Sequence, residues 1–253
     1  MLVLMSLLLF QTPELVTDRP DQSESAEVVP VGSWQFEMGV ARSESDPGIE
    51  FETTAFPQTL IRYGLNPNLE LRIGWDGVID VETDAFGGNS DSGAGDTSLG
   101  VKWKLFDERG RRPQMAIVAG TNLTTAEDGF GSDEFEPAVR LAFSSTLSDR
   151  LGLGYNLGWS SLRTDDGIDE HTLATVQYSM VLGIGVSDRV GAFIEAFGDV
   201  PASAPGGPSN SIDTGITVAL SPLVQVDAAG GFGISDEADD WFATVGISFR
   251  LDR

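Results

Sequence analysis

Apolar residues recur at every second position along most of this chain, and short polar turns separate the alternating stretches. A period of two is the signature of a β-strand, because successive side chains point to opposite faces of a sheet. In one stretch, one face is apolar and the other carries glycines and polar residues. The apolar residues are Leu151, Leu153, Tyr155, Leu157 and Trp159. Similar turns join several stretches, at Leu147 to Leu151, Val186 to Val190 and Leu220 to Val224. The pattern therefore predicts an all-β chain in which consecutive strands pair antiparallel.

The sequence predicts an even number of strands, twelve in all. About 9–11 residues suffice for a tilted strand to cross a bilayer, and the predicted strands reach or approach that length. The strands are expected at residues 33–42, 50–64, 68–79, 96–106, 113–122, 135–146, 150–162, 171–185, 189–199, 210–220, 223–233 and 240–251. An even number of long strands suits a sheet that closes on itself.

Short and long connections alternate strictly along the chain. The long ones are residues 43–49, 80–95, 123–134, 163–170, 200–209 and 234–239. Closed up-and-down transmembrane β-barrels combine short periplasmic turns with longer external loops. The chain is therefore predicted to form such a barrel, with both chain ends on the periplasmic side.

The non-apolar face of most strands is too small or too polar to pack against a second sheet. In the first strand, Trp34, Phe36 and Met38 share one face, whereas Gln35 and Glu37 share the other. This favours lipid outside and a hydrated lumen inside over a soluble β-sandwich, which also alternates. The strand at 189–199 leaves its orientation open, because Phe193 and Phe197 share a face with Glu195.

The net charge of −24 and the absence of cysteine exclude several functions. Such a negative chain repels nucleic acid, and without cysteine it has neither disulfides nor a thiolate nucleophile. The acids gather in the long loops and arginines in the short turns, which predicts a barrel that is negative outside. These acids are interpreted as solvated loop residues, with a specific cation site as the alternative.

The N-terminal residues Thr17, Asp18, Arg19, Pro20 and Asp21, followed by Gln22-Ser23-Glu24-Ser25, carry a family resemblance. They resemble the TDRPD-x-[ST]-E-S opening of a large group of Gram-negative outer-membrane proteins. That group is usually labelled "transporter" and is named for the MetA pathway of phenol degradation. The resemblance continues through Thr59 to Leu65 and Leu69 to Arg72, and it implies an outer-membrane location and a transport role. Such barrels tend to finish on an aromatic residue, whereas Phe249 is followed here by four more residues.

The chain is expected to have three parts. Residues 1–16 are expected to be a signal or leader segment, and residues 33–253 the barrel. The segment 17–32 either tucks into the lumen as a plug or forms a periplasmic tail, and the sequence leaves both alternatives open.

A set of charged residues shares the inward parity of the barrel. If Leu65-Asn66-Pro67 is a three-residue hairpin loop, Arg62 lies directly opposite Glu70. Two interpretations stand, namely a network that fills and stiffens the lumen and a charged constriction that selects solutes. The residues predicted to line the solute path are Arg62, Glu70, Arg72, Lys102, Lys104, Arg140, Asp213 and Asp227.

We therefore expect an outer-membrane channel for passive diffusion of small, aromatic or otherwise hydrophobic solutes. The alternative is a structural or surface-interaction barrel whose acidic loops bind cations or lipopolysaccharide. We expect no catalysis, cofactor or metal site, since the one histidine, His171, has only Ser160 and Ser161 as nearby candidate nucleophiles. The expected partners are outer-membrane lipid and a small solute. The outward faces are aromatic enough to contact lipid alone, so a monomer is expected.

Overall fold

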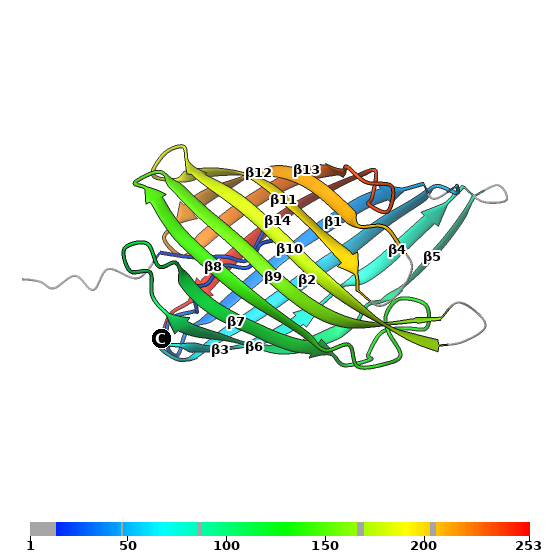
Figure 1. Cartoon of the computed structure of the whole chain (residues 1–253), viewed down its shortest axis with the longest axis horizontal. Helices are drawn as coiled ribbons and strands as arrows, with labels where there is room; N and C mark the ends of the chain where they lie inside the picture. Colours follow the sequence, from blue (N-terminus) through cyan, green and yellow to red (C-terminus); the bar gives the residue numbers. More distant parts are fainter. Residues whose placement is uncertain (1–13, 47, 85–87, 166–169, 203–205) are drawn as a thin grey trace, which may run out of the picture.

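The computed structural model describes residues 14–46, 48–84, 88–165, 170–202 and 206–253, and the side chains of residues 162–173 lie outside this description. The predicted leader therefore falls almost entirely outside the described residues, and so does the side chain of His171. Fourteen strands form one antiparallel sheet within the described chain (Figure 1). They are β1 (Trp34–Ser45), β2 (Phe51–Asn66), β3 (Leu69–Trp75), β4 (Val78–Thr83), β5 (Asn89–Ala94), β6 (Thr97–Phe106), β7 (Gln114–Asn122), β8 (Ala138–Ser148), β9 (Leu151–Asp165), β10 (Glu170–Gly185), β11 (Val190–Pro201), β12 (Ser209–Ser221), β13 (Val224–Gly233) and β14 (Trp241–Leu251).

The sheet closes on itself, because β1 pairs with both β2 and β14. The closed ring runs through twelve strands of the described chain: β1, β2, β3, β6 and β7 to β14. Closure removes the free strand edges that would otherwise be open to pairing with other chains. The predicted closed twelve-stranded antiparallel barrel is thus confirmed.

One predicted loop is wrong in detail. Much of the segment 80–95 is strand, because β4 and β5 form a hairpin that extends the sheet beyond the ring. The registers of the β2–β3 and β2–β4 pairings are continuous, with Thr59 opposite Trp75 and Phe56 opposite Val78. The chain therefore makes one long crossing that is interrupted at Asp76 and Gly77, where Gly77 adopts a φ of +86°.

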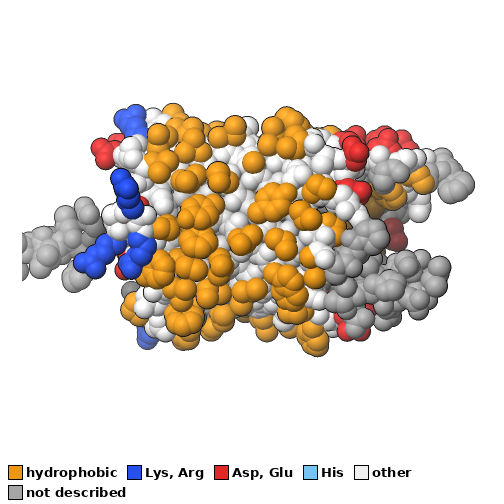
Figure 2. All heavy atoms as spheres, viewed as in Figure 1, with side chains coloured by type: hydrophobic (Ala, Val, Ile, Leu, Met, Phe, Trp, Pro, Cys, Tyr) orange, Lys and Arg blue, Asp and Glu red, His pale blue; other side chains and the backbone are white. Residues whose placement is uncertain are grey.

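The distribution of apolar and polar side chains in the barrel is the reverse of that in a soluble protein. Large apolar side chains face outward, with Trp103 at 53% exposure, Leu157 at 52% and Val245 at 53%. Figure 2 shows a band of such side chains across the face in view. Among the described residues, the fully buried large side chains are polar, and they are Arg62, Lys102, Gln35, Glu37, Glu70, Glu195 and Ser248. Separately, the described chain contains no helix of the length and hydropathy that a membrane-crossing helix needs.

The strand whose orientation the sequence left open, β11, follows the same rule. Glu195 is 1% exposed and Phe193 7%, so this face points into the lumen, whereas Ile194 is 56% exposed and points outward. The lumen consequently contains aromatic rings as well as charges on this side.

The two ends of the barrel differ in charge. Lys and Arg side chains gather at the end that carries the short turns, and Asp and Glu at the end that carries the long loops (Figure 2). The C-terminus lies at the short-turn end (Figure 1). Arg250 donates to the carbonyl oxygen of Glu14 at 3.2 Å, so the first described residues lie at that end too.

Candidate functional site

Residues 14–30, which we call the plug, run through the lumen of the barrel. The backbone N–H of Gln22 donates to Glu195 on β11 at 2.7 Å, and that of Val29 donates to Glu70 on β3 at 2.8 Å. These two strands lie on opposite sides of the closed ring. Of the two arrangements that the sequence left open for this segment, the structure has the one inside the lumen.

Three cations on neighbouring strands, Arg62, Arg72 and Lys102, form what we call the basic wall. Their side chains converge on Asp18 of the plug, with Arg62 at 3.1 Å, Arg72 at 2.7 Å and Lys102 at 2.7 Å from Oδ2. All three are buried. Burial alone would raise the pKa of Asp18, but these three cations hold it well below its usual range. Asp18 is therefore a carboxylate that ties the plug to the wall.

The predicted register of the hairpin between β2 and β3 is wrong. The turn residues are Pro67 and Asn68, and a bulge between Gly64 and Asn66 shifts the pairing. Arg62 consequently lies opposite Arg72, and not opposite Glu70. Arg62 nevertheless reaches Glu70 diagonally, with Nε at 2.8 Å from Oε1 and Nη2 at 3.0 Å from Oε2.

The plug supplies two more carboxylates to the cations of this side. Glu24 accepts from Arg72 at 2.8 Å and lies 3.3 Å from Lys102 and 3.9 Å from Arg140. Lys104 lies 3.6 Å from the second, Glu27. Five of the sequence-predicted cations are thus brought together around the plug.

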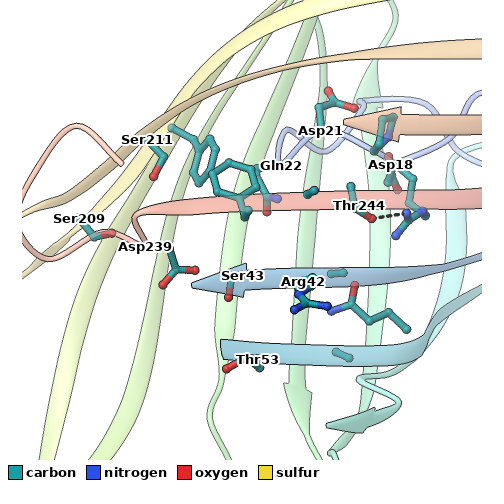
Figure 3. A pocket seen from close by; sticks show the side chains of 18 of the residues that line it. Asp18, Asp21, Gln22, Arg42, Ser43, Thr53, Ser209, Ser211, Asp239 and Thr244 are labelled. Carbon is teal, nitrogen blue, oxygen red and sulfur yellow. Dashed lines mark hydrogen bonds between the residues drawn. The ribbon is translucent and has the colours of Figure 1, made fainter. Parts of the chain in front are cut away.

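Arg19 occupies a socket on the other side of the plug. Its Nη2 lies 3.3 Å from Asp227. The same atom donates to Thr244 at 2.7 Å, which is the dashed line at Thr244 in Figure 3. A Cβ added to Gly246 would lie 2.6 Å from the Nε and Nη2 of Arg19, and one added to Gly39 would collide with the same guanidinium. Two glycines on adjacent strands therefore make the room that this side chain needs.

Acidic residues on three adjacent strands, Glu195, Asp213 and Asp227, form what we call the acidic wall. Glu195 lies directly opposite Asp213 in the β11–β12 pairing. Asp227 forms an ion pair with Arg19, and Glu195 accepts a hydrogen bond from the hydroxyl of Ser23 at 2.6 Å. Both side-chain oxygens of Asp213 are buried without a hydrogen-bond partner among the described residues.

The motif residue Asp21 lies beside this wall. Burial raises its pKa well above the usual range, and the charges of Glu195 and Asp213 raise it further. Sequence reasoning did not select Glu195, although its shared parity with Phe193 and Phe197 marked it as unusual. The remaining motif residues hold the plug in shape, since Thr17 donates to the carbonyl oxygen of Arg19 at 2.8 Å and Pro20 is buried.

Two cavities flank the plug. The outer cavity, toward the long loops, has a volume of about 530 Å³, and Asp21, Ser43 and Asp239 are among its lining residues (Figure 3). The inner cavity, toward the short turns, has a volume of about 600 Å³. Arg19 and Asp21 line both cavities, so the two spaces approach each other at the plug beside the acidic wall.

The acidic loops have a cavity of their own. A space of about 350 Å³ at the long-loop end is lined by carboxylates of Glu50, Glu52, Glu82 and Asp84. Neither there nor elsewhere in the described part of the chain are three or more His, Cys, Asp or Glu side chains grouped so as to hold a metal ion.

A comparison with protein families gives a match over most of the chain. The model of the family described as "Putative MetA-pathway of phenol degradation" matches residues 17–251. This range begins at the Thr17 motif and includes the whole barrel. A search of curated proteins gave no match.

Solved structures of outer-membrane barrels share the fold. An outer membrane channel from Pseudomonas putida F1 is 13% identical, with a TM-score of 0.68, covering 89% of this chain and 98% of that one. The NanC porin is 9% identical, with a TM-score of 0.56 and coverage of 86% and 100%. The translocator domain of the autotransporter NalP from Neisseria meningitidis is 13% identical, with a TM-score of 0.55 and coverage of 88% and 90%. At these identities the similarity shows the transmembrane β-barrel fold.

Proposed function

The chain belongs to the family described as putative MetA-pathway of phenol degradation, and from that premise we propose that it is an outer-membrane channel. Small, aromatic or otherwise hydrophobic solutes would cross it by passive diffusion, since the sequence contains no nucleotide-binding motif that could supply energy. The proposal assigns the chain no catalysis, and its partners are outer-membrane lipid and the solute. A single copy suffices, because each barrel encloses its own path.

One observation supports this proposal most strongly. The cavities of about 530 Å³ and about 600 Å³ lie on opposite sides of the plug, and both are lined by Arg19 and Asp21. We take the place where both cavities meet Arg19 and Asp21 as the narrow point that a solute entering from the long-loop end would pass. Asp227 is the ion-pair partner of Arg19, and Asp213 is on the neighbouring strand β12, which supports a role for both residues in this path. By contrast, Arg62, Arg72 and Lys102 are committed to ion pairs with the plug.

Flux measurements on the purified barrel test the proposal. Liposomes that contain the protein should swell in isotonic solutions of small neutral solutes such as phenol-sized alcohols, and should not swell with oligosaccharides. The Arg19→Ala variant should swell faster, because the side chain at the narrow point is removed. Arg189→Ala, in a short turn outside the lumen, is the matched control and should behave as the parent. The absence of swelling for every small solute, in parent and variant alike, would contradict the proposal.

The alternative function is surface binding through the acidic loops. It is favoured by the cavity that Glu50, Glu52, Glu82 and Asp84 line at the long-loop end. Converting these four residues to their amides should leave liposome swelling unchanged if the chain is a channel. Loss of binding to lipopolysaccharide with divalent cations, at unchanged flux, would instead favour the surface role.

A further inference from the structure

The two sides of the lumen differ in how completely their charges are paired. Every cation of the basic wall has carboxylate partners at 2.7–3.3 Å, two of them from the plug, Asp18 and Glu24. On the opposite side, Arg19 lies within ion-pair distance of Asp227. In the described part of the chain, no Lys or Arg lies within that distance of Asp21, Glu195 or Asp213, which we call the acidic trio. The trio is therefore a group of three neighbouring carboxyl groups that has no cation within ion-pair distance in the described part of the chain.

Asp213 is the least satisfied member of the trio. The residue is 4% exposed, and neither carboxylate oxygen has a hydrogen-bond partner among the described residues. It also lies directly opposite Glu195, and like charges placed across a strand pair destabilise the sheet. A buried carboxylate without a partner is costly unless something else supplies donors or positive charge.

Aromatic rings flank Asp213 on both sides. A Cβ added to Gly231, which lies opposite Asp213, would be 2.5 Å from the Cβ of Asp213 and 2.5 Å from the Cζ of Phe242. The ring of Phe193 covers Gly215, two residues along β12. Phe242 lines the outer cavity and Phe193 the inner cavity, so one ring faces each space.

A third ring extends this aromatic surface. Phe197 meets Phe242 edge to face, with 5.6 Å between the ring centroids, and it also lines the outer cavity. Phe197 and Phe193 stand on the same face of β11 as Glu195, one on each side of it. Of the trio, Asp21 lines both cavities, whereas Glu195 and Asp213 are buried beside aromatic rings that line them.

We propose that the acidic trio, with Phe193, Phe197 and Phe242, binds the ammonium group of an organic amine passing through the lumen. An ammonium group offers three N–H donors and one positive charge, which match unpaired carboxylates. Aromatic faces attract cations and also accept the apolar body of an amine. The aromatic lining suits an organic cation better than a metal ion, for which no suitable grouping exists in the described residues. This inference rests on the proposed channel function and specifies a class of solute.

The test compares two probes of nearly the same shape, benzylamine and benzyl alcohol, on the full-length barrel in detergent at neutral pH. Calorimetry or ligand-observed NMR should detect benzylamine binding, with the alcohol at least about tenfold weaker, because loss of one buried charge interaction costs more than a factor of ten. The Asp213→Asn variant should lose about tenfold or more in benzylamine affinity and keep its affinity for the alcohol. Asp149→Asn, on a short turn, removes the same charge outside the lumen and should change neither.

Two results would overturn the inference. One is equal binding of the amine and the alcohol, and the other is unchanged benzylamine affinity in Asp213→Asn, which would mean that the trio holds only a proton. The shift of the unboiled band on a denaturing gel shows whether each variant is folded, and Asp213→Ser provides a second variant. Because binding is measured in detergent, failure here is distinct from failure of the channel proposal, which liposome swelling with benzyl alcohol tests separately.

Discussion

The basic wall and the acidic wall face each other across one lumen, yet the same plug interacts with them in opposite ways. Asp18 is held by three cations, whereas Asp21, three residues later, lies beside Glu195 and Asp213. The three cations outweigh the effect of burial and lower the pKa of Asp18, whereas the pKa of Asp21 is raised. The comparison teaches that inward carboxylates in one barrel can have very different surroundings. Those beside the basic wall are paired with cations and fasten the plug, whereas Asp213 has no hydrogen-bond partner among the described residues.

The largest effect should come from the residue on which the basic wall converges. Asp18→Asn leaves three buried cations short of a carboxylate, which we expect to cost about 3–5 kcal/mol of unfolding free energy. Urea unfolding of the barrel in lipid vesicles measures this. Glu27→Gln is the control, since Glu27 is 43% exposed and has one contact to Lys104 at 3.6 Å. That change should cost less than about 1 kcal/mol. Equal losses in the two variants would contradict the role of the basic wall.

A smaller effect should follow from closing the socket of Arg19. Gly39→Ala would place a Cβ against the guanidinium and 2.6 Å from the carbonyl oxygen of Val245. Overpacking of this kind typically costs about 1–3 kcal/mol. Gly152→Ala is the matched control, because its nearest neighbour would be the carbonyl oxygen of Ser145 at 3.9 Å, and we expect a change within about 0.5 kcal/mol. The socket would be refuted if both glycines tolerated alanine equally well in the same urea assay.

The raised pKa of Asp21 should make the unfolding free energy of the barrel depend on pH. The folded pKa of Asp21 is raised above the unfolded value of about 3.9, so the folded barrel binds a proton that the unfolded chain does not. The resulting stabilisation is present at low pH and is lost as the pH rises through the folded pKa. We expect Asp21→Asn to remove this loss between about pH 4 and neutrality. A pH profile of Asp21→Asn parallel to that of the parent would contradict the assignment.

The contribution of Asp18 should depend on pH in the opposite sense, and this dependence should be smallest near neutral pH. Its folded pKa is depressed, so its stabilising contribution is complete above about pH 4 and disappears as the pH falls through the folded value. The difference in unfolding free energy between parent and Asp18→Asn should therefore be constant from neutral pH to about pH 5 and should shrink only in acid. A difference that already declined between pH 7 and 5 would count against this pairing.

The alternating pattern predicted the membrane-crossing strands well. It placed the seventh strand at 150–162, and β9 spans Leu151–Asp165. The pattern is strong there because one face must be apolar toward lipid while the other is small or polar. It failed at β4 and β5, which project beyond the ring, where neither face of a sequence such as Asn89-Ser90-Asp91 is apolar.

The lumen was harder to predict. Inward parity correctly placed Arg62 and Glu70 on one face, but the bulge at Leu65 changed their register, and a bulge leaves no mark on a period-two pattern. The partners of these charges lie in the plug, about forty residues away in sequence for Val29 and Glu70. The pattern did not identify Glu195 as a lumen residue, because Phe193 and Phe197 on the same face resemble a row of lipid-facing side chains. Contacts between distant segments and aromatic lumen residues were therefore beyond the reach of a local pattern.

The reversal potential of single barrels in planar bilayers under a salt gradient is the most direct measurement. If solutes pass between the cavities beside Glu195 and Asp213, the barrel should conduct, and its reversal potential should indicate a preference for cations. Asp213→Asn should reduce that preference. A barrel that conducted nothing, or that preferred anions, would contradict a path along the acidic wall.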